Sequence, residues 1–218
     1  MSLSLQTIVS MPFAENTYIL RLSDSKDCVV VDPGLEPQGI QVLIEENGLT
    51  LVAILNTHGH TDHIAGNGYL KRLHPDAPLV IGEGDAPMLT DPELNLSASY
   101  GFEIVSPPAD RTVKEGDALH YAGMTFDVLD IPGHSPGHVV FVMKEQKIVL
   151  GGDVLFRGGI GRADFPGGDF KLLAEGIRNK LFPMDADVVV YPGHGPVTKI
   201  GYEKRTNPFV GDNADRNW

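Results

Sequence analysis

Short apolar runs recur along the whole chain, and most of them have the length and composition of β-strands. Turn residues such as Asp32-Pro33-Gly34 separate them. The run 51–55 is continuously apolar, as is typical of a strand that is covered on both faces. The pattern predicts strands at 3–9, 17–22, 28–31, 51–55, 79–81, 118–121, 125–131, 139–143, 147–150 and 188–190.

Apolar residues recur at helical spacing in only a few places. Helices are predicted around 40–44, over 64–73 and over 170–181, and the polar tail from Lys199 is expected to be a loop or a short helix. The weakly periodic segment 82–111 predicts a short helix with loops, either a lid near a site or a plain surface excursion. Because strands dominate and no linker or repeat interrupts them, we expect one domain over 1–218, with two packed sheets and helices outside.

Composition narrows the classes of function. The 218 residues include 25 Gly and 16 Pro, and 42% are hydrophobic, which suits a folded chain dense in turns. The net charge of −12 argues against a nucleic-acid partner and against an anionic membrane surface. Cys28 is the one cysteine and lies in an apolar run, so we expect a buried thiol and a reducing, cytoplasmic location.

The histidines and aspartates form a pattern that predicts a metal site. His58, His60 and His63 lie close together around Asp62, directly after the strand 51–55. Three further candidates, each preceded by a glycine, follow predicted strands: His134, Asp153 and His194. Each residue alone has a structural explanation, such as a helix cap for Asp62. Together they place imidazole and carboxylate ligands at the ends of rigid strands, where they can converge on one point.

Seven donors exceed the four that one tetrahedral ion takes. We therefore expect two divalent metal ions that share one carboxylate, with Zn²⁺ favoured and Fe or Mn²⁺ as alternatives. Such a site activates water at neutral pH and polarises a carbonyl, so no serine nucleophile is required. Ser135 follows His134 without a nucleophile-elbow motif and is interpreted as a turn residue.

Other polar residues have two interpretations each. Asp32 either supports the site from below or simply forms a turn, which is the simpler view. His138 either orients a ligand or is a core histidine with its hydrogen bonds satisfied. His74 is expected to be solvated, and His120 to lie within a strand.

The motif His58-x-His60-x-Asp62-His63, followed by Pro-Gly-His, Gly-Asp and a second Pro-Gly-His, resembles the metallo-β-lactamase superfamily. The resemblance spans residues 57 to 195. It implies an α/β fold of the αββα type, in which two mixed β-sheets are flanked by helices and the site lies at one edge. By the family pattern, the first metal would be held by His58, His60 and His134, and the second by Asp62, His63 and His194. Asp153 would bridge the two ions.

Within the superfamily, the stretches 152–162 and 191–195 resemble the glyoxalase II-like hydroxyacylglutathione hydrolases. This implies hydrolysis of S-2-hydroxyacyl glutathione thioesters, such as S-D-lactoylglutathione, by a metal-bridging hydroxide that Asp62 could orient. Arg162 keeps a basic position of that family and is a candidate substrate-binding residue. Asp164 and Pro196 replace two tyrosines that contact glutathione there, and no C-terminal helical domain follows, so the chain looks like a short, single-domain branch.

Two alternatives share these motifs. A persulfide dioxygenase would bind one Fe(II) through His58, His134 and Asp153, although such enzymes typically have Ala-His-Asp where this chain has Gly193-His194-Gly195. A lactonase or another ester hydrolase would use the same metals. The expected partner is a small-molecule thioester, and the expected assembly is a monomer or a small homo-oligomer.

Overall fold

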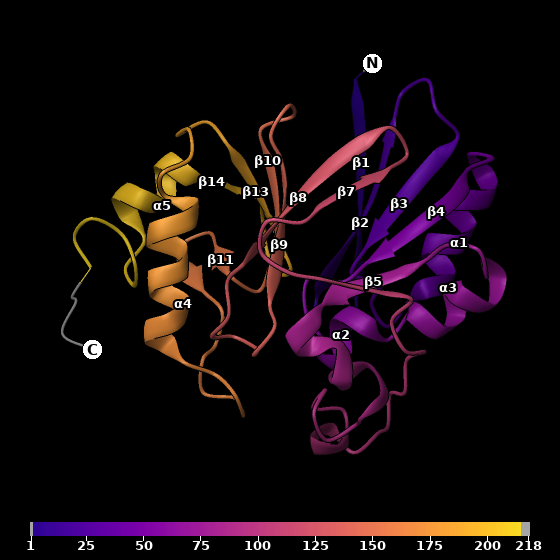
Figure 1. Cartoon of the computed structure of the whole chain (residues 1–218), viewed down its shortest axis with the longest axis horizontal. Helices are drawn as coiled ribbons and strands as arrows, with labels where there is room; N and C mark the ends of the chain where they lie inside the picture. The colour runs from indigo at the N-terminus through magenta and orange to yellow at the C-terminus, as the bar shows by residue number, and fades with distance from the viewer. Residues whose placement is uncertain (1, 215–218) are drawn as a thin grey trace.

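The computed structural model describes residues 2–214, and two six-stranded sheets face each other in it (Figure 1). The first sheet follows chain order: β1 (Leu3–Ser10), β2 (Glu15–Leu22), β3 (Asp27–Val31), β4 (Thr50–Leu55), β5 (Leu79–Gly82) and β6 (Arg111–Val113). Strands β1 to β3 pair antiparallel, whereas β3 to β6 pair parallel. Parallel pairing brings the ends of β4 and β5 to the same edge of this sheet.

The second sheet has a different strand order. It runs β14 (Thr198–Lys199), β13 (Val189–Pro192), β10 (Ile148–Gly152), β9 (Val139–Met143), β8 (Met124–Asp130) and β7 (Ala118–Tyr121). Only β10 and β13 pair parallel. A separate hairpin joins β11 (Leu155–Phe156) to β12 (Gly159–Ile160). Both large sheets are therefore mixed, as predicted.

Alternating side chains explain why the first sheet is buried on both faces. On β2, Tyr18 and Leu20 pack into the core between the sheets, with Phe126 and Phe141 of the second sheet. Ile19 points the other way, into a second core under the helices. Successive residues of a strand point to opposite faces, so one apolar strand supplies both cores.

Helices cover the two outer faces (Figure 1). On the first sheet lie α1 (Pro37–Glu46), α2 (Thr61–Ile64) and α3 (Asn67–Leu73), and on the second α4 (Phe170–Gly176) and α5 (Ile200–Thr206). The Asp169 carboxylate caps α4 by accepting a hydrogen bond from the Leu172 N–H. The predicted αββα sandwich is confirmed. Within residues 2–214, no helix has the length and apolar character that crossing a bilayer requires.

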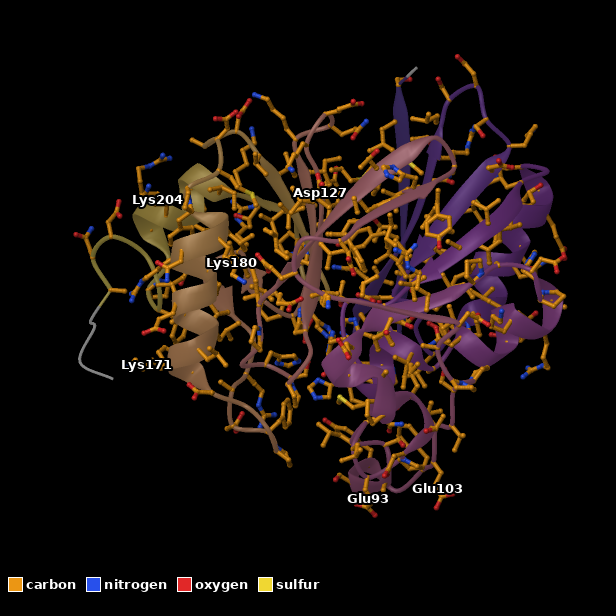
Figure 2. All side chains as sticks on the ribbon, in the orientation of Figure 1. Glu93, Glu103, Asp127, Lys171, Lys180 and Lys204 are labelled. Carbon is orange, nitrogen blue, oxygen red and sulfur yellow. The ribbon has the colours of Figure 1, made fainter. Side chains whose placement is uncertain are left out.

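The structure differs from the predicted helices at three points. The helix expected over 64–73 is two helices, and at the break the Gly66 N–H donates to the Pro33 carbonyl at 2.8 Å instead of to a helix carbonyl. The helix expected over 170–181 changes to a π-helical turn from Ile177. Segment 82–111 forms two 3₁₀ helices, η1 (Glu83–Thr90) and η2 (Ala98–Tyr100), and Glu93 and Glu103 extend from its outer tip (Figure 2).

Candidate metal centre

All seven predicted ligands come together at one end of the two sheets. His58 and His60 follow β4, and Asp62 and His63 lie on α2. The second sheet contributes one residue after each of three strands: His134 after β8, Asp153 after β10 and His194 after β13. The site therefore lies across the junction of the two sheets, and each sheet supplies part of it.

The donor atoms fall into groups whose members lie within 4.8 Å of one another. These groups are His58, His60 and His134; Asp62, His63 and His194; and His58, His63 and Asp153. The Asp153 carboxylate lies between the first two, since Oδ2 is 3.4 Å from His134 Nε2 and 3.5 Å from His194 Nε2. Its Oδ1 is 3.5 Å from His63 Nε2.

Three of these histidines are anchored through one ring nitrogen and present the other to the centre. His134 Nδ1–H donates to the Arg162 carbonyl at 2.7 Å, and His194 Nδ1–H donates to the Phe13 carbonyl at 3.1 Å. His63 Nδ1 lies 3.1 Å from Asp32 Oδ2. A carbonyl only accepts, so it fixes the proton on Nδ1 and leaves the Nε2 lone pair free to bind a metal.

Unpartnered atoms show that this cluster fits metal ions. Among the described residues, the buried atoms His58 Nε2, His63 Nε2 and Asp153 Oδ1 have no hydrogen-bond partner. Leaving buried polar atoms unpaired is costly, and a divalent cation at this point would satisfy all three. Imidazole nitrogen with carboxylate oxygen is a donor set that suits zinc, iron or manganese.

The protonation states of His58, His60 and Asp153 also suit ligation. At His63, burial lowers the pKa, but Asp62 and Asp153 outweigh it and raise that pKa well above its usual value, so metal binding there displaces a proton. Burial lowers the pKa of the His58 imidazole well below its usual value and lowers the pKa of His60 to about 3, so both rings are neutral. Neutral imidazole is the ligating form. Burial would raise the pKa of Asp153, but the neighbouring histidines, His63 foremost, outweigh it and hold that pKa low, so the carboxylate is ionised.

A family model described as the metallo-beta-lactamase superfamily matches residues 11–194. The chain belongs to the metallo-β-lactamase superfamily. It is 36% identical to hydroxyacylglutathione hydrolase GloC of Haemophilus influenzae, over 95% of this chain and 98% of that protein. The crystal structure of the BLEG-1 B3 metallo-beta-lactamase superposes with a TM-score of 0.91 at 36% identity, over 95% of this chain and 99% of that chain. TTHA1623 in a di-iron-bound form gives a TM-score of 0.84 at 38% identity, over 94% and 100%.

In this member of the superfamily, Asp32 does more than form a turn. It has a positive φ of 50°, but its buried carboxylate also accepts hydrogen bonds from the Thr57 N–H and hydroxyl, both at 2.7 Å. The same carboxylate contacts His63, so the supporting role is the one that the structure favours. His138 likewise orients a ligand, because its Nε2 accepts the Asp153 N–H at 3.0 Å.

Asp85 is a buried residue of the site that the sequence analysis missed. Its carboxylate accepts hydrogen bonds from the Gly59 and Gly137 N–H groups and from the Ser135 hydroxyl. A signal for it was present, since Asp85 follows the strand 79–82 after two glycines, the same setting as the predicted ligands. Ser135 therefore has a hydrogen-bonding role beyond its turn.

The metallo-β-lactamase centre opens into a cavity of about 250 Å³. Leu96 and Tyr100 of segment 82–111 form part of its wall, so this segment borders the site. The remaining lining is mainly aromatic and metal-binding side chains: Phe13, His60, Thr61, Asp62, Asn95, His134, Asp153, Phe156, Ile160, Arg162, Phe165 and His194.

Arg162 lies at this cavity, but its charge is already paired. Its guanidinium makes two hydrogen bonds to the Asp164 carboxylate, at 2.9 and 2.8 Å, and lies 4.2 Å from the centroid of the Phe165 ring. Asp164 thus pairs with the side chain of the predicted substrate-binding residue. The contribution of Arg162 that the structure shows directly is its backbone carbonyl, which anchors His134.

The remaining histidines lie outside the centre. His74 is half-buried rather than solvated, because its Nε2 lies 2.7 Å from Gln41 Oε1. His120 lies on β7, as predicted, and is exposed. Cys28 is fully buried, and burial raises the pKa of its thiol to about 12.

Proposed function

We propose that this metallo-hydrolase cleaves S-2-hydroxyacyl glutathione thioesters, such as S-D-lactoylglutathione, with two divalent ions. The observation that carries the proposal is the complete set of seven donors, with Asp153 among the other six, at the floor of an open cavity. The similarity to GloC over nearly the full length of both chains supports the thioester as substrate.

The residues have separate tasks in this proposal. His58, His60 and His134 would hold one ion, Asp62, His63 and His194 the other, and Asp153 would contact both. Divalent ions supply Lewis acidity toward a carbonyl and lower the pKa of water. The Asp62 carboxylate lines the cavity, where it can accept a hydrogen bond from the attacking water and orient it.

The aromatic wall suits exclusion of bulk water and contact with apolar parts of the substrate. Phe165 packs edge-on against His60 at 5.3 Å between centroids, and Phe156 packs similarly against His194 at 6.2 Å. These rings limit the positions that the ligand imidazoles can adopt on the open side of the site.

One comparison of activities tests the proposal. Metal per chain is measured on the purified protein, and S-D-lactoylglutathione hydrolysis, glutathione-persulfide oxygen uptake and β-lactam hydrolysis are assayed in parallel. We expect two metals per chain and thioester hydrolysis as the fastest reaction. A single iron with oxygen uptake would support the dioxygenase alternative. Fast β-lactam cleavage without thioesterase activity would place the chain with BLEG-1 in activity as well as in fold.

A further inference from the structure

Asp85 is a buried carboxylate outside the ligand set with unusually complete hydrogen bonding. It follows β5, at the start of η1, and is fully buried. Its Oδ2 accepts the Gly59 N–H at 2.9 Å and the Ser135 hydroxyl at 2.6 Å, and its Oδ1 accepts the Gly137 N–H at 2.5 Å. Three donors converge on one side chain that contributes no atom to the metal-binding groups of the described residues.

The three donors belong to the two loops that carry the first metal group. Gly59 lies between His58 and His60, on the side of the first sheet. Ser135 and Gly137 follow His134, on the side of the second sheet. The Asp85 carboxylate is thus the point at which these two loops are held together.

We propose that Asp85 is a positioning residue, which fixes His134 relative to His58 and His60 and thereby sets the metal affinity of this three-histidine group. The proposal rests on the metal centre of the proposed function. Asp85 acts through the backbone of both loops, and it touches neither ion nor substrate.

The backbone around Asp85 is built for this close approach. A Cβ on Gly82 would lie 2.1 Å from the Gly137 carbonyl oxygen, and one on Gly84 would lie 2.8 Å from Gly137 Cα. A Cβ on Gly137 would lie 2.2 Å from the Asp85 N atom. Side chains at these positions would push the loops apart, so glycine on both sides allows the carboxylate to reach its donors.

A carboxylate is the group that this position requires. It offers only acceptors, and both oxygens are used. Asparagine would direct an N–H₂ group at one of the existing donors, and alanine would remove the acceptor of two backbone N–H groups, of which that of Gly59 is buried. Residues behind metal ligands typically change metal affinity by about 10–100-fold, which is the range we expect for one of the two ions.

Glu203 of α5, nine residues after His194, provides a matched control outside the His58, His60 and His134 loops. It is also a buried carboxylate with three donors, the Gly158 N–H, the Thr198 hydroxyl and the Asn207 amide. Its loss costs similar hydrogen bonds, but its donors lie in the β11–β12 turn, on β14 and at the end of α5, outside the loops that carry His58, His60 and His134.

The test measures zinc affinity by chelator competition, together with zinc per chain and the melting temperature of the metal-free protein. Asp85→Asn and Asp85→Ala should weaken one of the two zinc-binding steps by about 10–100-fold, and Ser135→Ala, which removes a single donor, should weaken it less. Glu203→Gln should lower the melting temperature of the metal-free protein and leave both zinc affinities unchanged.

Two outcomes would overturn the proposal. One is wild-type affinity for both zinc ions in the Asp85→Asn and Ser135→Ala variants. The other is an equal loss of zinc affinity in Glu203→Gln, which would make the effect one of general stability. Because the readout is metal affinity, the result decides the role of Asp85 whether or not the wild-type protein hydrolyses a thioester.

Discussion

The loops that carry His134 and His194 both come from the second sheet, and both must be held against the first. They are held in different ways. The His134 loop depends on the Asp85 carboxylate, with one backbone bond nearby, from the Val139 N–H to the Thr57 carbonyl at 2.8 Å. The His194 loop is held along its length by Asn16 and Tyr18 of β2.

The contacts on the His194 side overlap. The Pro192 carbonyl accepts from the Asn16 amide at 3.0 Å and from the Tyr18 hydroxyl at 2.6 Å. The Asn16 side chain also donates to the Gly195 carbonyl at 2.9 Å, and its backbone N–H donates to the Gly193 carbonyl at 2.7 Å. The His134 loop is therefore held mainly by one buried carboxylate. The His194 loop is held by several neutral hydrogen bonds, two of which share the Pro192 carbonyl.

The largest effect should come from the residue common to both sides. Asp153→Ala removes the carboxylate that lies between His63, His134 and His194, so metal content should fall and hydrolysis should drop by more than the roughly 100-fold typical of residues behind the ligands. Asp127→Ala is a suitable control, since Asp127 pairs with Lys144 and is not one of the seven donors. Figure 2 shows Asp127 far from the tip of segment 82–111 that carries Glu93 and Glu103. Full activity of Asp153→Ala would contradict its shared role.

On the His134 side, Gly137→Ala should act like a change at Asp85. Its Cβ would lie 2.2 Å from the Asp85 N atom and 2.5 Å from the Gly84 carbonyl carbon, so the loop must move. We expect unfolding to become easier by about 1–3 kcal/mol, with loss of zinc affinity. Gly39→Ala in α1 is the control, because its nearest neighbour is 3.9 Å away, and it should stabilise by about 0.5–1 kcal/mol. Denaturant titration measures the stability of each variant, and chelator competition measures its zinc affinity. A Gly137→Ala protein with normal zinc affinity would contradict the role of this loop contact in positioning His134.

On the His194 side, single changes should be mild and their combination should not. Tyr18→Phe should cost about 1 kcal/mol, because the Pro192 carbonyl keeps one donor, and Asn16→Ala should cost somewhat more, because it also removes the bond to the Gly195 carbonyl. The double variant leaves this buried carbonyl without a side-chain donor, so its cost should exceed the sum. Thermal unfolding of the wild-type protein, the two single variants and the double variant measures the coupling. Strictly additive losses of stability would show that the two hydrogen bonds act independently.

The smallest effect concerns Arg162. Because Asp164 pairs with its guanidinium at the exposed rim, Arg162→Gln should raise the KM for S-D-lactoylglutathione by less than about fivefold. Asp164→Asn should lower that KM by a comparable factor, because it frees the cation for an anionic substrate. Steady-state kinetics of both variants measure these changes in KM. A loss of kcat in Arg162→Gln would instead indicate that the Arg162 backbone carbonyl, which anchors His134, had moved.

Much of this fold was predictable from the chain, because its core strands are apolar and long enough to show a pattern. The apolar run 139–143 indicates a buried strand. The side chains of β2 alternate between the core that lies between the sheets and the core under the helices. The strands that the sequence analysis missed, β6, β11, β12 and β14, are only two or three residues long and are too short for any periodicity. At the break between α2 and α3, the Gly66 N–H bonds to the Pro33 carbonyl, a partner that local sequence does not reveal.

The candidate site, like the fold, was predictable only in part. The ligands stand out because His and Asp recur after buried strands, and the structure brings all seven together. Their supports are visible only in three dimensions, since Asp32, Asp85 and Asn16 act on residues 25 or more positions away in sequence. Asp164 lies only two residues after Arg162, but that their side chains point toward each other is visible only in the structure.

The division of the donors between the two sheets has a consequence for synthesis of the chain. Four of the seven donors lie before residue 64, yet every group of three needs at least one from beyond residue 130. The N-terminal part of a protein leaves the ribosome first, so these four emerge long before their partners exist. None of the three groups can close until the second sheet has docked on the first. Stable metal loading would therefore mark the end of folding, and a chain cut short before β8 would carry the densest part of the motif without a site.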